Sequence, residues 1–404
     1  MKPPARLIRH AACLLVLGAL VAMRGGLGIA AEPGVYADEI LLGTHAPLSG
    51  PAARYGAVAR AARAYFDHVN DQGGVHGRRI RFVIRDDGFR PDEAERVVRE
   101  LVTRDRVFAI VGGFGDAPHS RVADYLNYGE IPDLFPTGGS SLWSSPLRRW
   151  TIAFQPTYRQ EGWALAAIAA RDHASSRAAV FAMAGEMGHD GAEGFRAGLR
   201  GKLPIVQEIF QEPTDGKTEE IVDGLRNAGV RIMALFTPPG AAARFMAIAG
   251  RKGWRPVYFV TTLASVPELI RRAGRRVAEE AIGLTFLPLP EDEKDPRVGR
   301  HREILARHAA DISLSRLTLY GQALAELTVE VLRRAGPSPT RDGAIKAAES
   351  LKGWNDQGRA LVRAVTLSAK NHLPLNALRT ALVRGGRWRP GNTWVDISPA
   401  EPGG

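Results

Sequence analysis

Asp86 and Asp87 are the residues of this chain whose types and spacing come nearest to acid–base chemistry. Two carboxylates can cleave a bond when both face it. Because neighbouring residues at the end of a strand point to opposite sides, we expect these two to cap the turn before Pro91 instead. The sequence also lacks GxSxG, HExxH, Walker and GxGxxG motifs, and its ten histidines show no metal-ligand spacing. We therefore expect no enzyme, no metal site and no cofactor.

The turn after the first apolar strand indicates ligand binding. A strand expected over 39–46 ends at Pro47. Ser49 and Pro51 lie in the turn that follows, and an amphipathic helix begins at Gly56. In an open α/β sheet, N–H groups at the carboxyl end of a strand face outward and form a ready ligand site. The segment PLSGPAARYG is thus the first candidate site.

Residues 1–31 are expected to be a cleaved signal peptide. Basic residues precede an apolar run of 13 residues, 11–23, and the small residues Ala30 and Ala31 follow it. That run is shorter than the roughly 20 residues that a membrane-spanning helix needs. The single cysteine, Cys13, lies within it. We expect an exported, periplasmic protein without disulfides.

The formal net charge of +11 does not by itself predict a nucleic-acid partner. Four of the basic residues lie in the expected signal peptide, and the others are dispersed among acidic and apolar positions. No stripe of aromatic and basic residues accompanies them. We expect a basic, solvated surface and no nucleic-acid partner.

Strands alternate with amphipathic helices along the chain, and this alternation predicts parallel sheets built from βαβ units. The pattern occurs twice, which predicts an α/β fold of two similar doubly wound lobes. The strands expected in the first half are 39–46, 79–85, 107–112 and 132–135, and the helices are 56–70, 91–103 and 117–128. The second half has expected strands 177–183, 205–211, 231–236, 256–261 and 281–287, and expected helices 159–172, 189–200, 217–228, 240–251 and 266–273. Helices 297–309, 315–335 and 339–351 follow, and the remainder, with short apolar runs at 360–367 and 379–384, is expected to be irregular strands and turns.

Several segments in a fixed order carry a family resemblance: PLSGPAARYG, NDQGGVHGRRI, IRDDGFRP, VFAIVGGFGD, IPDLFPTGGSS, GHDGAEGFRAGL and RKGWRPVYFVTT. From about residue 38 to 390 the chain resembles the leucine/isoleucine/valine-type periplasmic binding proteins of ABC transporters. The resemblance implies the type I periplasmic binding fold, a small-molecule ligand that is amino acid-like or aromatic or organic acid-like, an ABC permease at the inner membrane as partner and a monomeric state. A binding protein that reports to a sensor or regulator is the alternative.

The resemblance also implies how the chain divides. Lobe 1 would consist of 38–153 plus 288–352, and lobe 2 of 154–287 plus 353–400. Three segments would cross between them, with hinges near 154–156 and 284–288.

Residue by residue, the first-lobe site falls on two turns and on the first candidate segment. The residues implied are Tyr55, Phe114, Gly115, Asp116, Gly139 and Ser140. Each has a structural alternative. Tyr55 could pack on the sheet, the glycines near 112–115 could serve only a tight turn, Ser140 could cap a helix, and Asp116 could cap helix 117–128.

The second-lobe site is expected at Tyr158, Met187, Pro238 and Thr262. Here the chain departs from the amino acid binders, because the region 261–264 has no acidic residue to pair with a ligand ammonium group. A buried ammonium without a carboxylate is costly, although Glu186 could supply one. We therefore expect a small organic ligand of apolar or aromatic character rather than a branched-chain amino acid.

Overall fold

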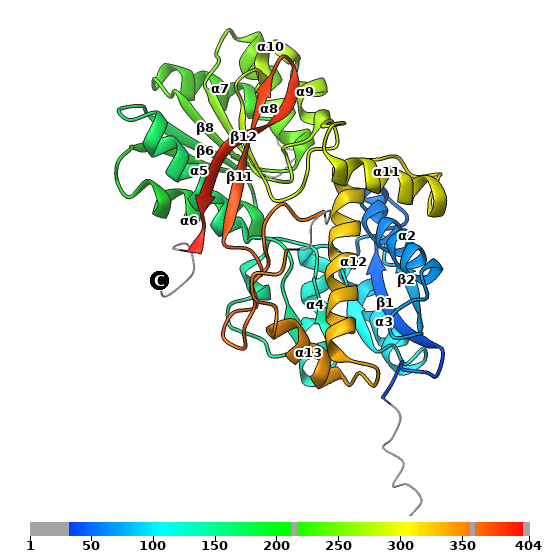
Figure 1. Ribbon diagram of the computed structural model, residues 1–404. Helices are drawn as coiled ribbons and strands as arrows, with labels where there is room; N and C mark the ends of the chain where they lie inside the picture. The colour runs from blue at the N-terminus through cyan, green and yellow to red at the C-terminus, as the bar shows by residue number, and fades with distance from the viewer. Residues whose placement is uncertain (1–31, 212–215, 356–359, 399–404) are drawn as a thin grey trace, which may run out of the picture.

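The computed structural model describes residues 32–211, 216–355 and 360–398, so the expected signal peptide lies outside the described residues. The chain forms two α/β lobes, each built on its own sheet (Figure 1). None of the helices in the described parts is long and apolar enough to cross a membrane.

The first lobe contains a five-stranded parallel sheet in the order β2-β1-β3-β4-β5. Its strands are β1 (Glu39–Ala46), β2 (Arg79–Asp86), β3 (Ala109–Val111), β4 (Asp133–Leu134) and β5 (Thr151–Ile152). The helices of this lobe are α2 (Ala57–Asp71), α3 (Pro91–Thr103), α4 (Asp116–Tyr128), α11 (Pro296–His308), α12 (Arg316–Ala335) and α13 (Arg341–Glu349), with short 3-10 turns η1 (Ala53–Gly56) and η2 (Ser141–Trp143).

Local sequence explains where these elements begin and which face they bury. Helix α3 starts with Pro91 at its first position, followed by Asp92 and Glu93, which favour the positive end of the helix dipole. Helix α12 begins at a capping box between Ser315 and Thr318. Figure 1 shows α12 lying beside α2, far away in the sequence.

The second lobe contains a seven-stranded sheet in the order β12-β11-β10-β9-β8-β6-β7. Its strands are β6 (Ala178–Met183), β7 (Ile205–Gln211), β8 (Ile232–Phe236), β9 (Val257–Val260), β10 (Ile282–Thr285), β11 (Ala377–Arg384) and β12 (Arg387–Asp396). Its helices are α5 (Tyr158–Asp172), α6 (Glu186–Leu199), α7 (Thr218–Asn227), α8 (Pro239–Arg251), α9 (Pro267–Ala273) and α10 (Arg275–Ala278). The doubly wound α/β class and most expected elements are confirmed.

The C-terminal part differs from the expectation. Strands β11 and β12 form an antiparallel hairpin, and β11 runs antiparallel to β10, so the second sheet is mixed. Gly385 and Gly386 connect the hairpin with φ angles of 61° and 71°, which glycine adopts without steric cost. The apolar run at 379–384, where irregular strands were expected, lies in β11, whereas β12 was not expected.

The expected lobe boundary after residue 352 also changes. Ala153 N–H donates to the His372 carbonyl over 3.1 Å, and Leu373 packs with Trp143 in a first-lobe cluster. Leu367 N–H donates to the Leu351 carbonyl at the end of α13. Leu367, His372 and Leu373 therefore pack on lobe 1, and of the described residues after 352 it is β11 and β12 that join the second sheet. The segment before β11 has no regular hydrophobic periodicity, so its sequence pattern does not predict the lobe on which it packs.

Candidate ligand-binding cavity

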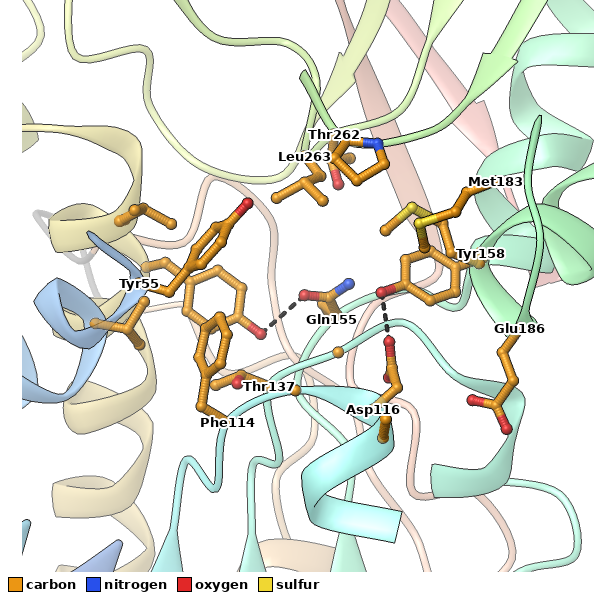
Figure 2. Close-up of a pocket in the computed structure, with 18 of the residues that line it drawn as sticks. Tyr55, Phe114, Asp116, Thr137, Gln155, Tyr158, Met183, Glu186, Thr262 and Leu263 are labelled. Atoms are coloured by element: carbon orange, nitrogen blue, oxygen red, sulfur yellow. Dashed lines mark hydrogen bonds between the residues drawn. The ribbon is translucent and has the colours of Figure 1, made fainter. Parts of the chain in front are cut away.

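A cavity of about 660 Å³ lies between the two lobes. This is the size of a pocket for a small molecule. Eight of the ten residues expected in the site line it: Tyr55, Phe114, Gly115, Asp116, Tyr158, Met187, Pro238 and Thr262. Figure 2 shows side chains from both lobes pointing toward one another around it.

The other two expected residues, Gly139 and Ser140, do not line the cavity. Gly139 packs against the Tyr158 ring, and its carbonyl accepts the Tyr158 N–H over 2.7 Å. The Ser140 hydroxyl caps η2 by accepting the Leu142 N–H over 3.2 Å, which is the helix-capping role given above as the alternative to ligand contact. These two residues therefore support the wall from behind.

Aromatic rings form the first-lobe wall. Tyr55 stacks on Phe114 with ring centroids 5.3 Å apart, and Phe89 lies 6.3 Å from Phe114. Tyr55 thus faces the cavity rather than packing only on the sheet. The sequence reasoning missed Phe89, which has a φ of +63° and follows the acidic pair. A left-handed backbone conformation is uncommon for an aromatic residue, and no local sequence pattern predicts it here.

The crossing segments form the floor of the cavity. The Tyr320 hydroxyl donates to Gln155 Oε1 over 2.9 Å, joining α12 to the first crossing segment. The Phe154 ring lies 4.7 Å from Tyr320 and 6.0 Å from Phe286. Gln155, Phe286 and Tyr320 line the cavity, although none was expected there. Any movement at the expected hinges would therefore change the cavity directly.

Asp116 lies in the first turn of α4 but does not cap it. Its Oδ2 accepts the Tyr158 hydroxyl over 2.7 Å, and its Oδ1 accepts the Ser140 N–H over 3.1 Å. The N-cap residue of α4 is Gly115. Burial raises the pKa of Asp116 to about 6, against the lowering effect of the Tyr158 hydroxyl, and the nearby Glu186 carboxylate raises it further.

Thr262 connects the second-lobe wall to a buried acid that the sequence reasoning missed. Thr262 N–H and Oγ1 donate to the two oxygens of Glu161 over 2.9 and 2.5 Å. Glu161 is fully buried on α5, and burial raises its pKa to about 7. It does not line the cavity. Both of its oxygens are engaged, so Glu161 supports Thr262 instead of facing a ligand.

Arg316 is a further lining residue that was not expected. It is the first residue of α12, and its guanidinium donates to the carbonyls of Ser265 and Leu284 and to Thr285 Oγ1, over 3.3, 3.4 and 3.0 Å. Burial lowers the pKa of Arg316 to about 10, against the raising effects of Glu161 and Glu291. It therefore remains a cation at neutral pH and links α12 to the second lobe.

Two polar contacts join the lobes at the rim. Arg54 of η1 forms an ion pair with Glu268 of α9, with 2.7 Å between Nη1 and Oε2. Ser141 Oγ donates to Asp190 Oδ2 of α6 over 2.7 Å. The two lobes are thus in contact between η1 and α9 and between η2 and α6.

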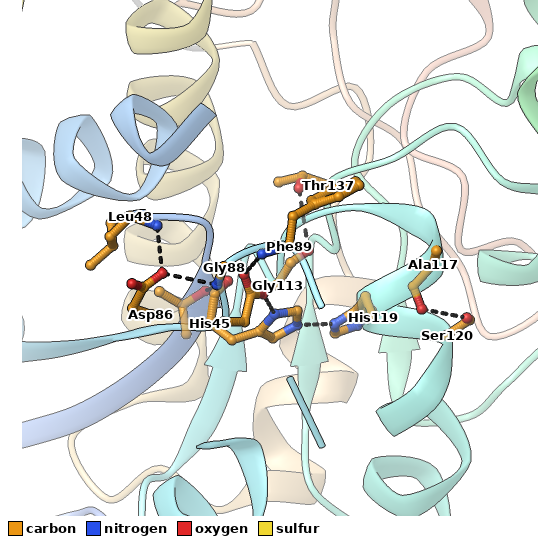
Figure 3. Close-up of polar contacts among 12 residues, drawn as sticks. His45, Leu48, Asp86, Gly88, Phe89, Gly113, Ala117, His119, Ser120 and Thr137 are labelled. Atoms are coloured by element: carbon orange, nitrogen blue, oxygen red, sulfur yellow. Dashed lines mark hydrogen bonds and ion pairs between the residues drawn. The ribbon is translucent and has the colours of Figure 1, made fainter. Parts of the chain in front are cut away.

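Asp86 and Asp87 hold different loops, Asp86 from an exposed position and Asp87 from a buried one, and Figure 3 shows Asp86 beside Leu48 and Gly88. Asp86 Oδ1 accepts the N–H groups of Leu48, Ser49 and Gly88 over 2.8, 3.2 and 2.9 Å. It therefore fixes the first candidate segment. Asp87 is buried, and its Oδ1 accepts the Phe89 N–H over 2.7 Å. The pair positions loops of the cavity and offers no shared acid–base site.

A buried histidine pair lies beneath these loops (Figure 3). His45 Nδ1 lies 2.6 Å from Asp87 Oδ2, His45 Nε2 lies 2.9 Å from His119 Nδ1, and His119 Nε2 lies 3.0 Å from both oxygens of Asp133. All four side chains are fully buried. A side chain at Gly113 would clash with both rings.

Burial lowers the pKa of His45, against the raising effect of the hydrogen bond to Asp87. His45 is therefore neutral at pH 7, with its Nδ1–H donating to Asp87 and its Nε2 facing His119. Since Asp87 also holds Phe89, this network anchors part of the aromatic wall. No local pattern predicts this network, because His45 and His119 are 74 residues apart.

Two mostly parallel sheets, joined by crossing segments around a cavity, define the architecture of a two-lobed solute-binding protein. Residues 39–387 match the family model described as periplasmic binding protein. The chain belongs to this family, whose members are binding proteins and not enzymes.

Known relatives agree with that assignment. Leu/Ile/Val-binding protein homolog 3 of Brucella melitensis is 26% identical over 218 residues, covering 53% of this chain and 57% of that protein. The chain thus matches little more than half the length of this relative. A leucine-, isoleucine-, valine-, threonine- and alanine-binding protein of Pseudomonas aeruginosa is 38% identical over 77 residues, covering 19% of this chain and 20% of that protein.

Solved structures show the same fold at low identity. A branched-chain amino acid ABC transporter protein of Thermus thermophilus, with bound valine, has a TM-score of 0.79 at 20% identity over 90% of this chain and 98% of that one. A fatty acid ABC transporter substrate-binding protein of Thermomonospora curvata has a TM-score of 0.79 at 21% identity, covering 92% and 96%. The type I periplasmic binding fold and the resemblance to Leu/Ile/Val-type proteins are confirmed.

Proposed function

We propose that this protein captures a small organic ligand with an apolar or aromatic body between its lobes and delivers it to an ABC importer. The observation that carries the proposal is the cavity itself. Tyr55, Phe89 and Phe114 form one wall, and Met187 and Pro238 belong to the facing wall. Such walls bind apolar solutes by burial and stacking.

The ligand is not a branched-chain amino acid in this proposal. On the second-lobe wall Thr262 faces the cavity, and the acid behind it, Glu161, already accepts two hydrogen bonds from Thr262. An α-ammonium group placed against Thr262 would find the Glu161 carboxylate behind the wall and already engaged, which is costly in a buried site. The relatives named above show that one fold is found in proteins named for amino acids and for fatty acids.

The biological setting belongs to the same proposal. The basic and apolar N-terminal residues support export to the periplasm, where the family acts. A monomer would open and close at 154–156 and 284–288, and the closed form would dock on the permease. Small-angle scattering should show compaction when a confirmed ligand is added.

A thermal-shift screen of the protein lacking residues 1–31 tests the proposal. Amino acids, aromatic acids, amides and amines would be offered at high concentration. A ligand at 100 times its Kd stabilises a protein by about 2.7 kcal/mol, which is easily detected. Calorimetric titration with leucine, isoleucine and valine is the counter-test, because micromolar binding of any of them would contradict the assigned ligand class.

A further inference from the structure

We propose that the ligand carries a cationic nitrogen that binds at Asp116, and that Asp116 excludes a ligand carboxylate from this end of the cavity. This inference rests on the proposed function and specifies the ligand class. It arises from what the Asp116 carboxylate occupies and from the charges around it.

The first step concerns the backbone N–H groups of the first-lobe wall. Outward-facing amides at turns and helix starts bind anions in many proteins. Here the Ser140 N–H already donates to Asp116 Oδ1, and the Tyr158 hydroxyl donates to Asp116 Oδ2. The Asp116 carboxylate thus already engages the Ser140 N–H and the Tyr158 hydroxyl, and a ligand carboxylate placed here would meet its negative charge.

Two carboxylates give this end of the cavity a negative charge. Asp116 and Glu186 both line the cavity, and each raises the cost of a further negative charge nearby. The groups that shift the Asp116 pKa include Glu186, Tyr158, Trp143 and the Ser140 amide, and no cation is among them. A ligand ammonium group would supply the missing positive charge.

The third step concerns Arg316, the cation on the cavity wall. Its guanidinium donates to Ser265, Leu284 and Thr285, and the fields of Glu161 and Glu291 act on it. It is therefore engaged at the contact between α12 and the second lobe and does not neutralise Asp116. An amine joined to an apolar or aromatic body matches the remaining surface, with its body against Tyr55 and Phe114.

Matched probes test this inference by calorimetry on the protein lacking residues 1–31. The probes 2-phenylethylamine, 3-phenylpropionate, 3-phenylpropionamide and phenylalanine share a phenyl group, and hexylamine, hexanoate and hexanamide repeat the charge comparison with an alkyl body. We expect an amine to bind at least about tenfold more tightly than its acid, its amide or the α-amino acid. Stronger binding of an acid or amide would overturn this inference and leave the proposed function standing. If no probe binds at millimolar concentration, and the broader screen is also empty, both fail.

Variants link the preference to the residue. Asp116→Asn keeps the side-chain shape and should weaken amine binding by about tenfold or more, whereas Asp116→Ser should improve binding of the acid by freeing the Ser140 N–H. Asp124→Asn is the matched control on the same helix, because Asp124 pairs with Arg148 at the surface. Glu186→Gln gives a second cavity variant, with an expected loss of several-fold. Amine affinity that stays within about twofold in both Asp116→Asn and Glu186→Gln would overturn the inference.

Discussion

Replacing His45 should destabilise the protein and disorder the aromatic wall above it. His45 and Asp87 are fully buried and 2.6 Å apart, and Asp87 keeps only the Phe89 N–H if the imidazole is removed. Removing the imidazole donor leaves the buried Asp87 charge less compensated, and removing the partner of a buried charge costs about 3–5 kcal/mol. This is a large share of the about 5–15 kcal/mol that stabilises a typical domain. We therefore expect His45→Ala to lower the free energy of unfolding by about 3–5 kcal/mol.

The variant His45→Asn distinguishes the hydrogen bond from His45 to Asp87 from the hydrogen bond between His45 and His119. An asparagine amide can keep a donor near Asp87 but cannot reach His119, so we expect a smaller loss of about 1–3 kcal/mol. The exposed His189, which stacks on Phe210, provides the control His189→Ala. Urea unfolding followed by circular dichroism measures all three. Equal stability of His45→Ala and the wild type would refute the role assigned to the buried pair.

The contribution of His45 to the free energy of unfolding should change with pH in a definite direction. Because the folded pKa of His45 lies below its usual value, the unfolded chain binds a proton that the folded protein does not. The contribution of His45 is therefore complete above about pH 6.5 and declines as the pH falls, by at most about 1.4 kcal/mol per unit. Asp116 and Glu161, with raised pKa values, act in the opposite direction. The difference between wild type and His45→Asn, measured from pH 7.5 to 5, isolates the histidine.

Three further predictions concern the cavity. Phe114→Ala should weaken ligand binding by about 0.5–1.5 kcal/mol beyond its lost area, because Phe114 stacks on Tyr55 and also contacts the tilted ring of Phe89; calorimetry measures the loss, and unchanged affinity would contradict the aromatic wall. Glu268→Gln should reduce affinity by up to about fivefold with little change in urea stability, since the partly exposed pair with Arg54 joins the lobes; equal loss of stability and affinity would show that it only supports the fold. Amine binding should strengthen as the pH rises through about 6, where Asp116 ionises, and this slope should disappear in Asp116→Asn, although Glu186 still faces the site.

Local pattern predicted most elements because their burial is periodic. Strand β1 has the predicted bounds, and α2 buries Val58, Tyr65 and Phe66 on the face that the spacing indicated. Strand β12 was missed because Arg389, Pro390 and Gly391 interrupt any alternation. The Gly385–Gly386 pair was the available hairpin signal.

The site was predictable where it lies on loops at strand ends. Tyr55 and Phe114 follow β1 and β3, so topology alone brings them to one edge. Arg316, Tyr320 and Gln155 reach the cavity only because α12 and a crossing segment meet there. Glu161 lies 101 residues from the threonine that it holds. Such contacts depend on the packing of the two lobes, which one sequence does not reveal.

The most direct test of the central claim is a crystal structure of the protein with the tightest ligand from the screen. The account predicts a ligand enclosed between the lobes, with its body against Tyr55 and Phe114 and within contact of Thr262 across the cavity. A ligand bound elsewhere, or bound to one lobe without contact to the other, would contradict it.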